Sequence, residues 1–194
     1  MLLKKKKRFS ITEGQIKEAL LSPDGRLLVR VNIKYPIIDC EKGDPLSIFA
    51  KDFYKDLAES LLQNAKNGIY SSSLEVLNSS PESFLPFAVL MRYEITLENQ
   101  DFLSIVTDIS ISDGKENKTA ARTTQVWERA FGTKCPISYF LTKQEIIELK
   151  SSLEPSLKKH FNPSLFALNG EEVVFYADFG GEYEKIIQKP LKKI

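Results

Sequence analysis

The stretch that decides the fold is residues 87–127, FAVLMRYEITLENQDFLSIVTDISISDGKENKTAARTTQVW, in the middle of the 194-residue chain. Apolar and polar residues alternate along it, which is the spacing of strands that bury one face. A turn at 98–101 separates two such strands, so the sequence predicts an antiparallel hairpin. The side chains expected on its buried face are Phe87, Val89, Met91, Tyr93, Ile95 and Leu97, then Leu103, Ile105, Thr107, Ile109 and Ile111.

Asp113-Gly114 predicts a second hairpin, into a strand over 117–130. A strict two-residue turn would place the buried isoleucines opposite charged residues, namely Glu116, Lys118 and Arg122. Charges on a buried face cost too much free energy without partners. One extra residue turns every following side chain to the other face, which places Asn117, Thr119, Ala121 and Thr123 opposite the isoleucines instead. We therefore predict a three-residue or bulged loop at 112–116.

Toward the N-terminus, a strand is predicted over Leu27–Lys34, where apolar residues again alternate with polar ones after the turn Asp24-Gly25. Tyr35-Pro36 is expected to end it, because proline cannot donate to the hydrogen-bond ladder. Residues 8–20 are expected to form a strand that pairs with it as a hairpin.

A long helix is predicted next, with Asp44 at its N-cap and Pro45 at its first position. Asn67-Gly68 is expected to end this helix, and the Ser-, Asn- and Pro-rich residues 71–83 to form a surface loop. The expected core-facing stripe recurs every four residues at Phe49, Phe53, Leu57 and Leu61.

The C-terminal third predicts a second helix followed by another hairpin. Thr142-Lys143-Gln144-Glu145 is a capping box, and Pro155 is expected to start a short helical turn that ends at His160. Asn169-Gly170 predicts a hairpin that joins 164–168 to 171–179, and 183–189 is a candidate last strand. The expected core face of the helix is Ile146, Leu149, Leu153 and Leu157.

These elements predict one α+β domain over residues 1–194, an antiparallel β-sheet built from hairpins with two main helices packed on it. The basic segment 1–8 is expected to be flexible. A chain of this length removes roughly 70% of its unfolded surface from water on folding, so it needs no disulfide or metal for stability.

The charge balance excludes a general affinity for nucleic acid, since 27 basic and 26 acidic residues give a net charge of +1. No stretch is apolar enough for an export signal or a membrane span, so the chain as written is expected in the cytoplasm. Cys40 and Cys135 are interpreted as two reduced thiols, with one disulfide as the open alternative.

No catalytic residue, metal site or cofactor is predicted. The single histidine, His160, follows two lysines at a helix end and is expected to be solvated. Asp108 and Asp113 fall on one hairpin and Asp178 near the end of the chain, too scattered to predict a metal site, and Asp108 is expected to point to water. No phosphate-binding loop or nucleophile elbow occurs.

What remains is the surface. The hairpin around 112–118 carries exposed charges, and aromatic residues are enriched at the centres of binding interfaces. The candidate binding residues are Asp113, Lys115, Lys118, Trp127, Tyr139, Tyr176 and Tyr183.

The order of several motifs is similar to a known bacterial domain. The motifs are Lys34-Tyr35-Pro36-Ile37-Ile38, then Phe102–Val106, Val126–Lys134, Ile137–Leu141 and Phe166–Tyr176. They resemble the domain that forms the extracellular part of lysozyme-sensing anti-sigma factors and precedes some polysaccharide deacetylases. The resemblance implies an α+β fold without an enzymatic site, some of whose members bind a protein or act near cell-wall glycans. Members often carry Gly-Gly-Ala-His-Gly in the central hairpin, where this chain has Ser112–Lys118, so a role of that histidine does not carry over.

Three hypotheses follow. The first is a non-enzymatic binding module that recognises a protein. The second is a glycan hydrolase that uses two carboxylates, or a cell-wall-associated glycan binder. The third is a structural subunit of a homodimer built on an exposed edge strand.

Overall fold

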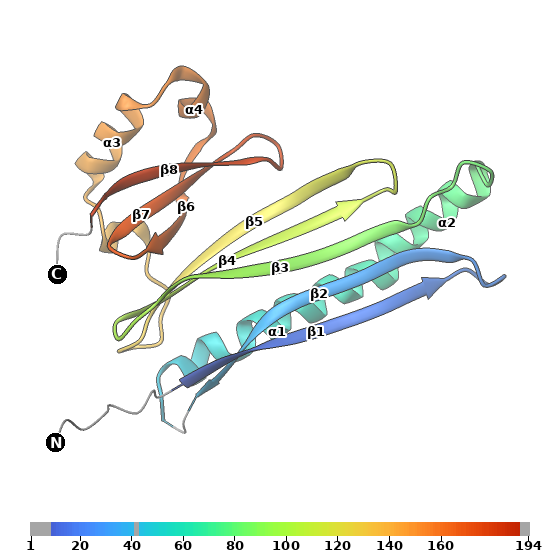
Figure 1. Ribbon diagram of the computed structural model, residues 1–194, viewed down its shortest axis with the longest axis horizontal. Helices are drawn as coiled ribbons and strands as arrows, with labels where there is room; N and C mark the ends of the chain where they lie inside the picture. Colours follow the sequence, from blue (N-terminus) through green and yellow to red (C-terminus); the bar gives the residue numbers. More distant parts are fainter. Residues whose placement is uncertain (1–8, 41–42, 191–194) are drawn as a thin grey trace.

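The computed structural model describes residues 9–40 and 43–190, and it contains two β-sheets and two helical regions (Figure 1). The five-stranded sheet has the order β1-β2-β3-β4-β5, and the three-stranded sheet the order β6-β7-β8. The predicted α+β class is confirmed. The strands are β1 Phe9–Leu21, β2 Leu27–Cys40, β3 Phe87–Glu98, β4 Phe102–Ser112, β5 Asn117–Glu128, β6 Phe161–Asn169, β7 Glu172–Asp178 and β8 Tyr183–Pro190.

The helical regions lie on opposite sides of the two sheets. The first runs without a break through α1 Leu46–Asn64, the π-helix η1 Ala65–Ile69 and α2 Tyr70–Ser79. It packs on the five-stranded sheet. The second comprises the 3-10 turn η2 Ile137–Tyr139, α3 Lys143–Ser152 and α4 Pro155–His160, and it packs on the three-stranded sheet. The layers therefore follow the order helix, sheet, sheet, helix where the two sheets overlap (Figure 1).

The five-stranded sheet is mixed rather than wholly antiparallel. β2 and β3 run parallel, and their register joins Val29–Ile33 to Phe87–Met91. Parallel neighbours need a long crossover connection, which the first helical region supplies. The β1–β2 hairpin, expected from residues 8–20, is confirmed, as are the β3–β4 and β4–β5 hairpins.

The prediction that Tyr35-Pro36 ends the second strand is wrong. β2 continues to Cys40, and Pro36 pairs with Glu13 of β1. The parallel ladder with β3 stops at Ile33, so Pro36 lies where one side of β2 has no strand to receive a donated hydrogen bond. Proline is tolerated at such edge positions.

The first helix starts at Leu46, one residue later than predicted. The carboxylate of Asp44 still accepts a hydrogen bond from the Leu46 N–H at 2.9 Å, so it serves as a cap. The buried stripe is rotated from the predicted one, since Phe49 is 54% exposed. Small residues on the buried side let the helix approach the sheet closely. The buried side chains are Leu46, Ala50, Tyr54, Ala58, Leu61 and Ala65.

The predicted stop at Asn67-Gly68 and the predicted loop over 71–83 are also wrong. The helix passes Gly68 through a π-helical turn and continues to Ser79. Ile69, Ser73 and Leu77 recur every four residues and are buried, so the apolar face persists through the serine-rich stretch. The serine hydroxyls do not compete for the helix, because Ser73 and Ser79 donate to helix carbonyls at 2.8 Å.

The extra residue predicted for the β4–β5 hairpin exists, but it lies in the strand. The loop is 113–116, because Ser112 pairs with Asn117. Ser110 pairs with Thr119 and Ile109 with Ala121, which leaves residue 120 as a bulge. Beyond the bulge, Ala121, Thr123 and Trp127 share the face of the isoleucines, as predicted. Before it, half-buried Ile111 lies opposite Lys118 at the end of the sheet, where burial is incomplete.

The C-terminal elements are confirmed, with one turn displaced by a residue. The capping box is complete, with the Thr142 N–H bonded to Glu145 Oε2 at 2.8 Å and the Glu145 N–H bonded to Thr142 Oγ1 at 3.2 Å. Pro155 starts α4, which ends at His160. In the β6–β7 hairpin Asn169 pairs with Glu172, so the turn residues are Gly170 and Glu171, one position later than Asn169-Gly170.

Both cysteines are free, and Cys135 is buried. Within the described ranges, no helix combines the length and apolar character needed to cross a membrane. The predicted flexible segment 1–8 lies outside the described residues.

Candidate binding surface

The two faces of the five-stranded sheet differ in what covers them. The first helical region packs against one face. On the other face, the three-stranded sheet covers one end of β4 and β5. There the N–H of Phe166 donates to Thr124 Oγ1 at 3.1 Å, and the N–H of Leu168 donates to Ser104 Oγ at 3.0 Å. The rest of this second face carries exposed or half-buried polar side chains and is called the open face; its central residues are Glu13, Asn32, Lys34, Arg92, Asp108 and Arg122.

A row of charges crosses the open face. Arg92 of β3 is opposite Asp108 of β4, and Asp108 is opposite Arg122 of β5. Paired residues of neighbouring strands share a face, so the strand register brings these three side chains together. Asp108 was expected to point to water; instead its two oxygens accept hydrogen bonds from Nε and Nη2 of Arg122, both at 2.6 Å.

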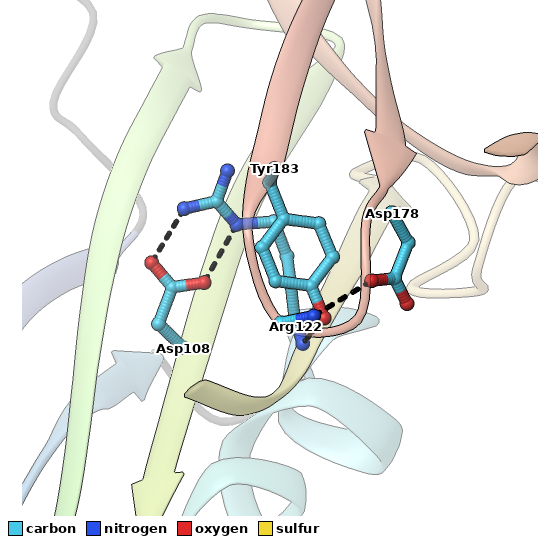
Figure 2. Close-up of polar contacts among 5 residues, drawn as sticks. Asp108, Arg122, Asp178 and Tyr183 are labelled. Atoms are coloured by element: carbon cyan, nitrogen blue, oxygen red, sulfur yellow. Dashed lines mark hydrogen bonds and ion pairs between the residues drawn. The ribbon is translucent and has the colours of Figure 1, made fainter. Parts of the chain in front are cut away.

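Arg122 is the most enclosed member of the row. Its guanidinium carbon lies 4.7 Å from the ring centres of both Tyr176 and Tyr183. Its backbone N–H donates to the Tyr183 hydroxyl at 2.7 Å. Figure 2 shows the two bonds to Asp108 and the Tyr183 ring beside the same arginine side chain. Two sheets therefore hold one guanidinium through a bidentate ion pair and two cation–π contacts.

The turn that carries Tyr183 is ordered by Asp178. Oδ1 of Asp178 accepts hydrogen bonds from the N–H groups of Gly180 and Gly181 at 2.9 and 3.0 Å. Gly180 and Gly181 have φ of 79° and 108°, conformations that side chains disfavour. This turn fixes where β8 begins, and hence where the Tyr183 ring meets Arg122 (Figure 2).

The electrostatics keep Arg122 charged. The hydrogen bond with Asp108 raises the pKa of Arg122, and burial opposes this effect. Burial raises the pKa of both Tyr176 and Tyr183, so the two hydroxyls stay protonated at neutral pH. Arg122 therefore presents a fixed positive charge between the two sheets.

A hollow of about 330 Å³ lies where β2 and β3 separate. The parallel pairing ends at Ile33 and Met91, and the two strands then diverge (Figure 1). We call this hollow the fork pocket. Its lining residues are Glu13, Asn32, Lys34, Leu90, Met91, Arg92 and Tyr93.

The cations of the fork pocket differ in their partners. Lys34 forms an ion pair with Glu13 at 2.9 Å. Among the described residues, no carboxylate lies within 4 Å of the exposed Arg92 guanidinium, even though Glu94 follows two residues later on the same face. Burial, followed by the charge of Glu13, raises the pKa of Tyr93. The pocket thus combines a neutral phenol, a compensated lysine and an uncompensated arginine.

The four aromatic residues predicted to bind a partner differ in how exposed they are. Trp127 and Tyr176 are each 2% exposed, so the prediction of a direct surface contact is wrong for both. Trp127 is packed beneath the first helix, where its Nε1–H donates to the Tyr54 hydroxyl at 2.9 Å. Tyr183 is half-buried beside Arg122. Tyr139 is 41% exposed, and its hydroxyl donates to Glu128 at 2.9 Å.

The predicted charged hairpin lies apart from the aromatic residues. Asp113 and Lys115 are exposed in the 113–116 loop, and Lys118 is opposite Ile111 in the backbone register. Gly114 packs tightly on the preceding connection, since a Cβ there would lie 2.5 Å from the Cβ of Leu85. The structure therefore brings together Tyr176 and Tyr183, but not the hairpin with Tyr139.

Sequence reasoning missed Arg92, Lys34 and Arg122. A usable signal existed, because Arg92, Asp108 and Arg122 alternate in charge on three consecutive strands. This charge pattern can be interpreted only when the strand register is known, because the bulge at residue 120 places Arg122 opposite Asp108.

The described residues bear on the hydrolase hypothesis as well. Glu13 is the one carboxylate that lines the fork pocket, and a second hollow beside Leu21 and Tyr70 has none. Over residues 9–40 and 43–190, no group of three metal-ligating side chains converges. His160 is exposed at the end of α4, with its Nδ1 2.7 Å from the carbonyl oxygen of Asp178.

No protein-family model and no curated protein sequence matches this chain. Solved structures do match its fold. A member of the DUF3298 family from Bacteroides fragilis superposes with a TM-score of 0.64 at 9% identity, over 94% of this chain and 90% of that one. A DUF3298 family protein from Pseudomonas aeruginosa PAO1 gives a TM-score of 0.50 at 11% identity, over 91% and 89%. The chain is therefore similar to DUF3298 proteins in fold.

Proposed function

We propose that the chain is a non-enzymatic binding module that recognises a protein partner through its open face. The observation that carries the proposal is Arg92 in the fork pocket, an exposed guanidinium without a carboxylate within 4 Å among the described residues, beside a hollow of about 330 Å³. A guanidinium binds carboxylates through paired hydrogen bonds. The expected partner therefore presents an acidic side chain to this pocket.

The other charged side chains of the open face support recognition rather than catalysis. Asp108 is already bonded through both oxygens to Arg122, and Glu13 is paired with Lys34. Rigid, preformed side chains lower the entropy that binding costs. The row thus offers an ordered surface whose unmatched charge is positive.

A protein partner is favoured over a glycan by the tyrosines. Tyr176 and Tyr183 are the aromatic side chains beside Arg122, and both rings contact its guanidinium. They leave no free aromatic platform at this position. The resemblance to the domain of lysozyme-sensing anti-sigma factors, some of whose members bind a protein, agrees with this choice.

The test is an affinity capture from the native cells with three baits. Wild-type protein and Arg26→Glu are expected to recover the same partner, and Arg92→Glu is expected to lose it, because the new carboxylate repels an acidic group. Arg26 is a matched control, since it is an exposed arginine in the turn between β1 and β2. Recovery of the same partner with Arg92→Glu would contradict the proposed surface.

A fourth bait separates this surface from the hairpin. Replacement of residues 113–116 by glycines is expected to leave capture unchanged, because the loop lies outside the open face. If this bait alone loses the partner, the contact lies at the hairpin and the open face is not the binding surface.

A further inference from the structure

The outer edge of β1 is long and regular. All residues of this 13-residue strand pair with β2 on the inner side. No strand lies beyond β1 in the sheet order, so its outward backbone groups pair with no strand of the described chain. The opposite edge strand, β5, is in contact with β6. A long unpaired edge is a template for pairing with another chain.

We propose that β1 pairs antiparallel with β1 of a second copy, about a two-fold axis at Gln15. Gln15 is the midpoint of Phe9–Leu21, so this register keeps the whole strand paired. It places Glu13 opposite the partner's Lys17 and, by symmetry, Lys17 opposite the partner's Glu13. Such self-complementarity is what an interface with two-fold symmetry requires.

Neighbouring registers lack this match. A two-fold axis keeps equal faces aligned, so the possible registers differ by two residues, and a shift in one direction places Lys17 opposite the partner's Gln15 and Glu13 opposite the partner's Ala19. A shift in the other direction places Glu13 opposite the partner's Gln15 and Lys17 opposite the partner's Ile11, so neither shift pairs opposite charges. Opposite-charge cross-strand pairs stabilise a sheet and like-charge pairs destabilise it, so the charges select the register centred on Gln15.

The side chains concerned are available for this pairing. Lys17 is exposed and has no carboxylate within 4 Å among the described residues. The Glu13 side chain contacts Lys34 but is 46% exposed, so its carboxylate remains accessible to a second copy. Leu21, which is 52% exposed, would lie level with the partner's Phe9 at each end of the paired strands.

The pairing has a consequence for the surface. The two five-stranded sheets become one continuous sheet, and the same face of each copy points the same way. Two open faces then lie side by side, which raises the avidity for a partner that carries two acidic segments. The dimer itself does not depend on the proposed function of that face.

The test is a dilution series of the full chain by light scattering. Wild type is expected to show a concentration-dependent mass between monomer and dimer. Lys17→Glu is expected to weaken dimerisation at least tenfold, because four carboxylates then meet across the axis. Lys51→Glu is the matched control, an exposed lysine on α1, and is expected to dimerise like wild type.

Charge exchange provides an independent arm. Glu13→Lys alone is expected to be monomeric, and an equal mixture of Glu13→Lys with Lys17→Glu is expected to regain the dimer mass, since each lysine then faces a glutamate. A wild type that is monomeric at every concentration overturns the proposal. So does a dimer whose affinity is the same in Lys17→Glu.

Discussion

At the same level of β4 and β5, polar side chains of the described chain are hydrogen-bonded on one face of the sheet and lack a hydrogen-bond partner on the other. On the helix side, Thr107 pairs with Thr123, and both hydroxyls are buried without a hydrogen-bond partner among the described residues. On the open side, Asp108 and Arg122 are adjacent to them in sequence and are joined to each other by two hydrogen bonds. The unpartnered hydroxyls on the helix side therefore cost free energy, because burial removes the water that would otherwise bond them. On the open side, the ion pair fixes the positions of two charged side chains that water reaches.

The largest expected effect is a loss of stability when the row of charges on the open face loses Arg122. Arg122→Met removes the ion pair and both cation–π contacts, and it leaves the half-buried Asp108 carboxylate without its partner. We expect the free energy of unfolding to fall by about 2 kcal/mol, less than for a fully buried pair because Asp108 is 37% exposed. Urea denaturation measures it.

Arg122→Lys is the matched control for this change. Lysine keeps the charge but lacks the planar fork that bonds both carboxylate oxygens. An intermediate loss is expected. Equal stabilities of wild type, Arg122→Lys and Arg122→Met would show that the row is not held by this contact.

A smaller loss of stability is expected when the Tyr183 hydroxyl, which links the two sheets, is removed. Tyr183→Phe removes the hydroxyl that accepts the Arg122 backbone N–H at 2.7 Å but keeps the ring over the guanidinium. The expected cost is about 1 kcal/mol. Tyr139→Phe is the control, since its hydroxyl bonds the side chain of Glu128 at an exposed site, and its cost should stay below about 0.5 kcal/mol. Equal costs in thermal denaturation would argue against this link between the sheets.

The smallest effect has the opposite sign and comes from the helix side. Thr107→Val replaces a buried, unpartnered hydroxyl by a methyl group of similar size. The chain is expected to gain up to about 1 kcal/mol, because folding no longer strips water from that hydroxyl without replacement. Thr96→Val is the control and should destabilise, since the Thr96 hydroxyl bonds Ser104 Oγ at 2.8 Å. A loss of stability in Thr107→Val would mean that its hydroxyl is bonded in solution.

Features set by neighbouring residues could be predicted from the sequence. The capping box at Thr142, the start of α4 at Pro155 and the alternation in β3 and β4 each depend on a few adjacent side chains. Features that depend on what a segment packs against could not. The helix passes Gly68 because Ile69 and Leu77 are buried against the sheet, and this burial outweighs the local preference for a stop.

The candidate site illustrates the same limit more sharply. The Arg122 backbone and the Tyr183 hydroxyl that it contacts are 61 positions apart and belong to different sheets. Tyr183 could be selected as an aromatic residue, but its partner could not be, because no local pattern relates the two strands. The fork pocket depends on where a parallel ladder ends, whereas the sequence predicted a wholly antiparallel sheet.

We propose that the open face, through Arg92, binds acidic protein segments. The most direct measurement is an NMR titration of the full chain with a hexaglutamate peptide at low salt. We expect amide shifts that gather at Asn32–Lys34 and Leu90–Tyr93, that weaken with added salt and that disappear in Arg92→Glu. Shifts confined to residues 113–116, or an unchanged titration in Arg92→Glu, would contradict it.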